Sequence, residues 1–526
     1  MSTRSCTNDE GTTWASHPPT PPRVEAALLP AMHSSRVLSA AVALGLLLAG
    51  CQGADAEALI HWPVPQPPAV DRQSPVLWVS LEAHLGGGPL LLQGAGAPLQ
   101  LLDASGVRLS GQRLQLRWQS QPLAEPQEIR RTVAGPFSSF ESAEQVALAW
   151  RRQGVRAEVA HPRDWEVWAP AAVAPPPGVA VRQVQQRLTQ RLVPQLSTPQ
   201  GWRSLEGPIQ ISAPDGLRLG DGVFAGPFRL QADAYGSWTL VEQVPLERYL
   251  QGVVPHEIGA GSPAAALAAQ AVLARTWALR NQHRFAVDGY HLCADTQCQV
   301  YADPRQAGSA VRQAISNTAG RVLAWQGEPI HAVYHASNGG VSADEDEAWP
   351  LPELSYLEPA LDLRGPAPAG LSVPIESSAE LLQLLALRHG VVGETHPLFR
   401  WQRQLSQAAL RAGLGARAAA LGSPLKPVVL ERGPSGRVVR LAIEGPSGRV
   451  VLERDAIRRT YRQLPSTLFV LSPAAAGGWV VQGGGFGHGA GLSQAGAIDL
   501  AGRGWSVEQI LKRYYPSASL VLVKDL

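Results

Sequence analysis

The stretch from residue 244 to residue 280 constrains the fold of this chain more than any other. Apolar residues recur at helical spacing from Leu246 to Val253, and Pro255 then interrupts the pattern. Glu257 follows that interruption directly. The sequence therefore predicts a helix, a break, and a carboxyl group at the break.

A second helix is predicted after the break. Gly259 and Gly261 let the chain turn, Ser262 is a good N-cap, and Pro263 suits the first helical position. The alanine-rich run that follows, to about Arg280, is nearly all apolar, so we expect this helix to be buried.

Two roles are open for Glu257. Acids in loops are mostly solvated, which would make it an ordinary surface carboxylate. Partial burial would instead raise its pKa and suit it to donate a proton. Its expected place near the start of the second helix opposes this, because the helix dipole favours the carboxylate by about 0.3 to 1 kcal/mol.

Composition sets broad limits on the chain. With 526 residues and 45% hydrophobic content, it can bury at least one large core and should contain two or three domains. A formal net charge of +2 gives no support for a nucleic-acid partner, and none is predicted.

The N-terminal region resembles a bacterial lipoprotein signal. A short positive segment beginning at Met32 precedes an apolar run from Val37 to Leu48, and Leu-Ala-Gly-Cys51 follows. We expect lipidation of Cys51 and a membrane-anchored protein of the periplasm or cell envelope. A plain membrane anchor and an ordinary cleaved signal are the alternatives. Residues 1–31 are then an upstream extension, and residues 32–51 the signal.

The rest of the chain divides by composition. Residues 52–75 are predicted to be a linker, residues 76–169 a smaller β or α+β domain, residues 170–195 a linker and helix, and residues 196–526 the main domain. In the smaller domain, Ala134-Gly-Pro-Phe-Ser-Ser139 and the helical stretch after it faintly resemble half of a sporulation-related (SPOR) repeat, a glycan-binding module. An ordinary packing unit is the alternative. The predicted fold class is α+β, with a β-rich start to the main domain before the buried alanine-rich helix.

His291, Cys293 and Cys298 supply three soft ligands within eight positions. They would hold zinc if a fourth ligand came from elsewhere. The alternatives are a disulfide between Cys293 and Cys298, favoured by an oxidising compartment, or two free thiols. No other cofactor is expected.

A glycine-rich segment follows the strand-like run that begins at Trp479. Gly485-x-Gly487-x-x-Ala490 has the spacing of a dinucleotide fingerprint, but fewer than forty residues remain for the further strands of that fold. Ser493 is followed by Gln-Ala-Gly, so this is not a nucleophile elbow either.

Two runs in the first stretch, and the glycine-rich segment, resemble the stage II sporulation protein D and amidase-enhancer (SpoIID/LytB) family. The runs are Leu-Glu-x-Tyr-Leu-x-Gly-Val-Val-x-x-Glu, ending at Glu257, and Ala-x-x-Ala-Gln-Ala-Val-x-Ala-Arg-Thr, ending at Thr276. The third is Gly-x-Gly-His-Gly-x-Gly-x-Ser-Gln-x-Gly-Ala, which contains His488. The resemblance covers about residues 205–526. One departure is Ala336, where the family often has serine.

The resemblance implies site residues. Glu257 matches the catalytic acid of peptidoglycan glycan-strand cleavage, and Arg275 matches an arginine that helps form the cleft. Glycines would let the backbone approach a bulky glycan. The further substrate-binding candidates are Gln299, Tyr301, Tyr334, Ser337, Gly340, Gly487, His488, Ser493 and Gln494. The acidic run from Asp344 to Glu347 is expected to be a solvated loop.

The resemblance also implies a reaction. A glycoside hydrolase of the usual kind needs two carboxyl groups, and no second acid stands in a comparable motif. A lytic transglycosylase needs one, because the 6-hydroxyl of the sugar displaces the bond and leaves a 1,6-anhydro end. The alternatives are a non-catalytic peptidoglycan-binding enhancer of an N-acetylmuramoyl-L-alanine amidase and a structural wall-anchored lipoprotein.

Overall fold

The structure of the protein is a computed structural model that describes residues 59–475 and 477–526. The expected upstream extension, signal and Cys51 lie outside the described residues. The described chain belongs to a single unit, Glu57–Leu526. No helix in the described part is long and apolar enough to cross a membrane.

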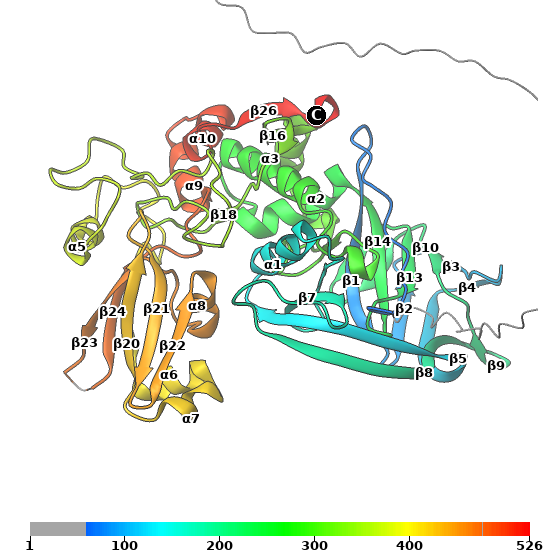
Figure 1. The fold of residues 1–526 in the computed structure, drawn as a ribbon. Coiled ribbons are helices and arrows are strands. Elements are labelled where there is room, and N and C mark those ends of the chain that lie inside the picture. Colours follow the sequence, from blue (N-terminus) through cyan, green and yellow to red (C-terminus); the bar gives the residue numbers. More distant parts are fainter. Residues whose placement is uncertain (1–58, 476) are drawn as a thin grey trace, which may run out of the picture. The chain divides into compact units, whose positions relative to one another are not determined.

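A seven-stranded sheet positions the first helix (Figure 1). Its strand order is β15–β1–β14–β13–β10–β3–β4. The strands are β1 (Val76–Leu85), β3 (Leu99–Leu102), β4 (Arg108–Gly111), β10 (Ile209–Ser212), β13 (Phe228–Ala232), β14 (Trp238–Pro245) and β15 (Leu292–Cys293). Strand β14 pairs antiparallel with β1 and leads directly into the first helix.

A second, larger sheet is built around a long strand, β5 (Arg113–Phe137). Its main path is β12–β11–β2–β5–β7–β6, and β8 pairs with β5 and β9. The other strands are β2 (Leu90–Gly94), β6 (Glu158–Ala160), β7 (Trp165–Pro170), β8 (Val181–Thr198), β9 (Gly201–Ser204), β11 (Leu217–Leu219) and β12 (Gly222–Phe224). Helix α1 (Phe140–Arg152) has Ser139 as its N-cap, which confirms the helical stretch expected after Ser139.

Three expectations for this half are wrong. Residues 181–195, predicted to be linker and helix, form most of strand β8, because their backbone pairs with β5. The residues on either side of the expected 170–195 boundary share sheets, since β1 pairs with β14 and β3 with β10. The linker expected over 52–75 is packed against the rest of the chain at its first described residues, because Leu59 forms a β-bridge with Ile129 and Ile60 is buried.

The predicted pair of helices lies at the centre of the largest apolar core. These are α2 (Leu246–Val254) and α3 (Ala264–Arg280). Every residue of α3 from Ala266 to Leu279 is buried, as predicted. Around them lie α4 (Ser309–Asn317), β16 (Arg321–Trp325), β17 (Glu328–Pro329), α9 (Gln494–Gly502), α10 (Val507–Tyr514) and β26 (Ser519–Leu522). Ser506 and Gln509 form a capping box at the start of α10.

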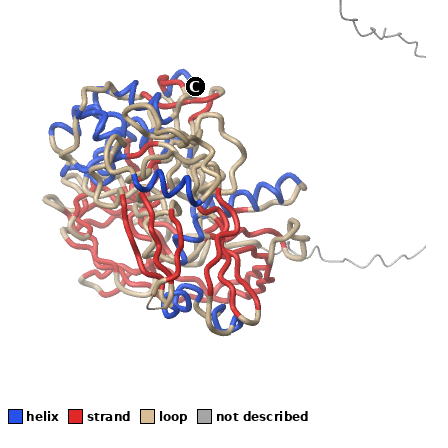
Figure 2. Tube along the Cα trace, turned by 90° about the vertical axis from the view of Figure 1, so that its left-hand side faces the viewer, coloured by secondary structure: helices blue, strands red, loops and turns tan. Residues whose placement is uncertain are grey.

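A further region has its own apolar core. It contains β19 (Arg400–Leu405), β20 (Lys426–Arg432), β21 (Val438–Gly445), β22 (Gly448–Glu453), β23 (Phe469–Pro473), β24 (Trp479–Gly484), α6 (Gln407–Leu414), α7 (Arg417–Leu421) and α8 (Asp455–Thr460). Helix α5 (Ser378–Ala386) buries Leu381, Leu384 and Leu385 in a smaller cluster beside it. Most of the strands lie below the main group of helices in Figure 2, so the predicted α+β class is confirmed.

Candidate functional site

Glu257 lies in a π-helical turn, Pro255–Gly259, that continues α2 beyond Val254. Such turns occur often at functional sites. The predicted cap of the next helix is wrong: Pro263 is the N-cap residue of α3, and the Ser262 hydroxyl donates to the Ile258 carbonyl oxygen at 2.7 Å. Glu257 therefore follows the C-terminal end of α2, whose dipole disfavours a negative charge. The dipole of the second helix, which was expected to favour the Glu257 carboxylate, therefore does not oppose protonation.

The carboxyl group of Glu257 is held from two sides. The Val300 backbone N–H donates to its Oε1 at 3.2 Å, and the Tyr334 hydroxyl lies beside it. Burial raises the pKa of Glu257 above its ordinary value, and these two hydrogen-bonding groups lower it only in part. The balance shifts Glu257 toward its protonated form, the form that can donate a proton.

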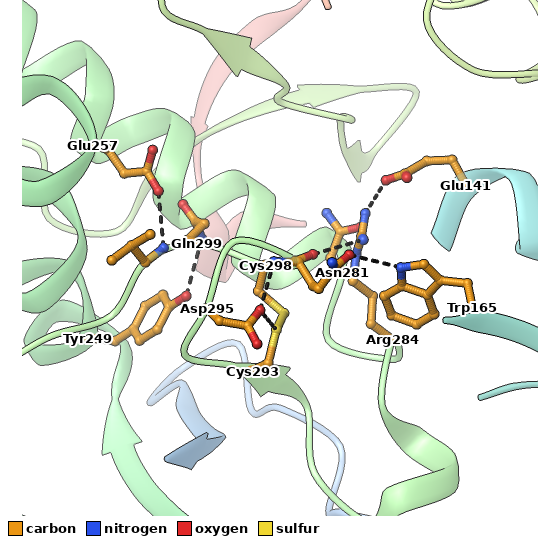
Figure 3. The surroundings of a disulfide bond; sticks show 12 residues. Glu141, Trp165, Tyr249, Glu257, Asn281, Arg284, Cys293, Asp295, Cys298 and Gln299 are labelled. Atoms are coloured by element: carbon orange, nitrogen blue, oxygen red, sulfur yellow. Dashed lines mark hydrogen bonds and ion pairs between the residues drawn. A yellow bond between two sulfur atoms is a disulfide. The ribbon is translucent and has the colours of Figure 1, made fainter. Parts of the chain in front are cut away.

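A buried glutamine orders the groups around Glu257 (Figure 3). The Tyr334 hydroxyl donates to Gln299 Oε1 at 2.9 Å, and Gln299 Nε2 donates to the Tyr249 hydroxyl at 3.4 Å and the Ala274 carbonyl at 3.3 Å. The Tyr334 hydroxyl has one proton. Directed to Gln299, it leaves the Tyr334 oxygen able to accept from a protonated Glu257, and directed to Glu257 it stabilises the ionised carboxylate. Gln299 and Tyr334 thus lie at the predicted site. Tyr249, which the sequence analysis treated only as an apolar helix residue, belongs there too.

Gly252 explains how the loop carrying Val300 reaches α2. A Cβ atom on Gly252 would lie 2.5 Å from the Tyr301 ring and 2.4 Å from the Ala302 carbonyl oxygen. The Ala302 N–H donates to the Gly252 carbonyl oxygen at 3.1 Å. Any side chain at this position would push the loop, and the Val300 donor, away from Glu257.

The cysteines of the same loop form a disulfide. Cys293 is bonded to Cys298, with their Cα atoms 5.7 Å apart. Both nitrogens of His291 are engaged, Nδ1 with the Trp78 N–H and Nε2 with the Pro68 carbonyl oxygen, each at 2.9 Å. The three predicted zinc ligands therefore do not fit a metal here, and the described residues contain no group of three His, Cys, Asp or Glu that could hold one. The structure shows the disulfide alternative.

Arg275 does not reach the site, contrary to prediction. Its side chain is fully buried and forms two hydrogen bonds of 2.7 Å with the Glu247 carboxylate on α2. It also donates to the Arg321 carbonyl oxygen at 3.0 Å. Arg275 holds α2, α3 and β16 together and cannot contact a substrate.

Tyr301 supports the loop in a similar way. Its hydroxyl donates to Glu242 Oε2 at 2.9 Å, and only 4% of the residue is exposed. Glu242 is fully buried and also accepts from the Ala225 and Gly226 N–H groups, each at 3.0 Å. The structure gives the Tyr301 hydroxyl an internal partner and not a place beside Glu257, and substrate binding by Tyr301 stays a prediction.

The glycine-rich segment supports the strand that carries Tyr334. Strand β18 (Tyr334–His335) pairs in parallel with β25 (Leu492–Ser493). Gly487 has φ +117°, and a Cβ atom there would lie 2.5 Å from the Cβ of His335. Gly340 has φ +101°, with Val391 similarly close. Both glycines allow chain segments to pack closely against each other. The expectation from the sequence was that glycines here let the backbone approach a glycan.

Three polar residues predicted to bind sugar are used within the fold. His488 donates from Nε2 to the Tyr334 carbonyl oxygen at 2.8 Å and accepts at Nδ1 from the Ala490 N–H at 3.3 Å. Burial lowers the pKa of His488 to about 3, so its ring is neutral. Ser493 is buried and caps α9, and Ser337 is buried in a bridge with Phe486. Each of the three polar groups therefore has an internal role in the structure, and sugar binding by them stays a prediction.

Gln494 contacts a buried residue of α3, Gln270, that was not among the residues predicted from the sequence. Its Nε2 donates to Gln270 Oε1 at 3.3 Å. Gln270 lies on α3 one turn before Ala274, whose carbonyl binds Gln299, so both contacts fall on one face of the helix. Gln270 Nε2 is buried without a hydrogen-bond partner in the described residues. Gln270 is the lone amide in an otherwise apolar stretch of α3, and that is the signal that could have found it.

The acidic run is not the solvated loop that we expected. Glu345 and Glu347 are 3% and 2% exposed. Glu345 accepts from the Leu354 N–H at 2.8 Å, and Glu347 accepts from the Ser435 hydroxyl at 2.6 Å. Burial raises the pKa of each to about 7. Neither shares a hydrogen-bond partner with Glu257, so Glu257 is the single acid of its network within the described residues.

Comparison with known proteins places this site in a family domain. Residues 234–325 match the family described as Stage II sporulation protein, and residues 343–491 match a domain of unknown function (DUF8618). Stage II sporulation protein D of Bacillus amyloliquefaciens is 27% identical over 303 residues, 53% of this chain and 75% of that protein. The Bacillus subtilis (strain 168) protein of the same name is 25% identical with the same coverage.

An amidase enhancer of Bacillus subtilis (strain 168) is 26% identical over 300 residues, 52% of this chain. The match covers only 40% of that relative's length. These relatives support a cell-wall role outside the cytoplasm. Together with the motifs around Glu257 and His488, they establish that the chain carries a domain of the stage II sporulation protein D and amidase-enhancer family.

Proposed function

We propose that this protein cleaves peptidoglycan glycan strands as a lytic transglycosylase, with Glu257 as its acid. The observation that carries this proposal is the half-buried Glu257 carboxyl group, whose pKa is raised and whose neighbours include a phenol and a backbone N–H. General-acid cleavage of a glycosidic bond needs a carboxyl group that stays protonated near neutral pH.

The proposed reaction uses one acid twice. Glu257 donates its proton to the glycosidic oxygen while the bond from that oxygen to C1 of the muramyl sugar breaks. The 6-hydroxyl oxygen of the same sugar bonds to C1, and its proton passes to the Glu257 carboxylate. No water is consumed, and the acid returns to its starting state. Tyr334 and the Val300 N–H stabilise the carboxylate between the two transfers.

The similarity to an amidase enhancer supports a second candidate function. In that case the protein binds glycan strands without cutting them and presents them to a separate cell-wall amidase. We also propose that Cys51, if lipidated, anchors the protein at a membrane beside its substrate.

Incubation with purified glycan strands, some intact and some stripped of their peptides, distinguishes the two candidate functions. We expect the wild-type protein and a control variant, Glu353→Gln, to release soluble fragments, and Glu257→Gln to release none while still binding strands. Glu353 is a suitable control because it is exposed and undergoes the same chemical change. Binding by all three proteins without release would reject cleavage and favour the enhancer function.

A further inference from the structure

A cavity of about 740 Å³ lies between the two large sheets, separate from the Glu257 network. Its walls come from the segment before β1, from β5, β8 and β9, and from β13 and the turn after it. Most of this lining precedes residue 234, where the matched family domain begins. A cavity of this size can enclose one or two sugar rings.

The charges around the cavity are unbalanced. Arg191, Arg203 and Arg229 line it, and Glu206 is the only acidic residue among the described residues of its lining. Within the described chain, none of these arginines has a carboxylate within 4.0 Å of its side-chain nitrogens, although many other arginines do. Arginine forms two-point hydrogen bonds with carboxylates, so three guanidinium groups that have no carboxylate partner among the described residues suit an acidic ligand.

Arg229 is the most informative of the three. Its Nε donates to Gln231 Oε1 at 2.7 Å, and its guanidinium lies 5.2 Å from the centre of the Trp78 ring. Burial lowers its pKa, which means that keeping the guanidinium charged in the cavity wall costs desolvation free energy. A bound anion would offset that cost.

The rest of the lining suits a ring. Trp62, Tyr235 and Trp238 contribute aromatic surface, and Gln121 and Gln190 contribute amides. Trp238 is fixed in place because its indole N–H donates to the Leu192 carbonyl oxygen at 3.0 Å. Flat aromatic faces pack well against the apolar faces of sugar rings, while amides and arginines can bond to hydroxyl and carboxylate oxygens.

We infer that this cavity is a second, non-catalytic binding site for an acidic saccharide, namely a muramic-acid unit of a glycan strand. This inference rests on the proposed function for the choice of ligand, because the lactyl group attached to the sugar ring of muramic acid carries a free carboxylate when the peptide is absent. The cavity then grips the strand while Glu257 acts elsewhere on it.

The test uses a soluble muramyl oligosaccharide with free carboxylates and an N-acetylglucosamine oligomer of the same length. Binding is measured by calorimetry on the Glu257→Gln protein, and protection of residues 188–208 by hydrogen–deuterium exchange. We expect the muramyl ligand to protect these residues and the neutral oligomer to protect them less. Arg191→Gln with Arg203→Gln should weaken muramyl binding about tenfold and abolish the protection.

Arg187→Gln is the matched control, because Arg187 is exposed on the same strand, β8, and does not line the cavity. Arg191 and Arg203 are exposed, so their replacement should not disturb folding. Equal binding and equal protection in the double variant and the control would overturn the inference. That result would not affect the role proposed for Glu257. If instead the wild-type protein cleaves no strands but the double variant still binds the muramyl ligand more weakly than the control, only the proposed cleavage is refuted.

Discussion

Removing the disulfide is expected to loosen the loop that holds Glu257. Cys298 lies immediately before Gln299 and Val300, which contact Tyr334 and Glu257. The bond joins residues five positions apart. Chain-entropy arithmetic for so short a loop gives about 2 kcal/mol, which is about thirtyfold in the equilibrium between the closed and open loop.

Hydrogen–deuterium exchange measures this directly. Exchange of the amides of residues 293–301 should accelerate by up to about thirtyfold in a protein carrying both Cys293→Ser and Cys298→Ser. Residues 417–421, in α7, belong to another core and serve as the internal control. Strand cleavage should fall in parallel, because Val300 loses its fixed position.

The pH dependence supplies a second check. The Val300 N–H lowers the pKa of Glu257, so loss of that contact should raise the pKa further and move the alkaline limb of the rate profile to higher pH. Unchanged exchange at residues 293–301 together with an unchanged pH profile would refute the role assigned to the disulfide.

Three further predictions follow from named contacts. Because burial raises the pKa of Glu257, the folded protein binds more protons than the unfolded one between the ordinary pKa and the raised one, so its stability falls as pH rises through that interval. Glu257→Gln should therefore match the wild type in thermal melts near pH 4 and exceed it at pH 8, and equal melting at pH 8 would contradict this. Arg275→Met should lower the free energy of unfolding by about 1 to 3 kcal/mol in denaturant titration, because it removes a buried guanidinium and its hydrogen bonds to Glu247, which is itself 42% exposed, whereas the control Arg187→Gln should change it little. Gly487→Ala should cost about 1 to 3 kcal/mol, because φ is +117° and the new Cβ meets His335; Gly502→Ala, which meets no atom within 4 Å, is its control, and equal stability of the two variants would count against the packing role.

The helix–break–helix element could be predicted from sequence because its signals are local. Apolar spacing, Pro255 and the alanine-rich run each act within a few residues, and α2 and α3 end close to where these signals place them. The cap at Ser262 could not be decided in this way, because its hydroxyl can bond either forward to the helix or back to Ile258.

The features that the sequence did not predict depend on partners distant in sequence. Arg275 and Glu247 lie 28 residues apart, and nothing between them indicates a buried pair. Strand β8 pairs with β5, which lies about 60 residues before it, and so overrides its mixed polar pattern. His488 and Ser493 have residue types suited to sugars, but folding gives their polar atoms backbone partners first.

The central claim is most directly tested by the mass of the sugar end released from purified glycan strands. We expect the wild-type protein and Glu353→Gln to release products with an anhydro-muramyl end, each one water lighter than the corresponding hydrolytic fragment. We expect no such products from Glu257→Gln. Products that carry the added water, or anhydro ends that persist in Glu257→Gln, would contradict it.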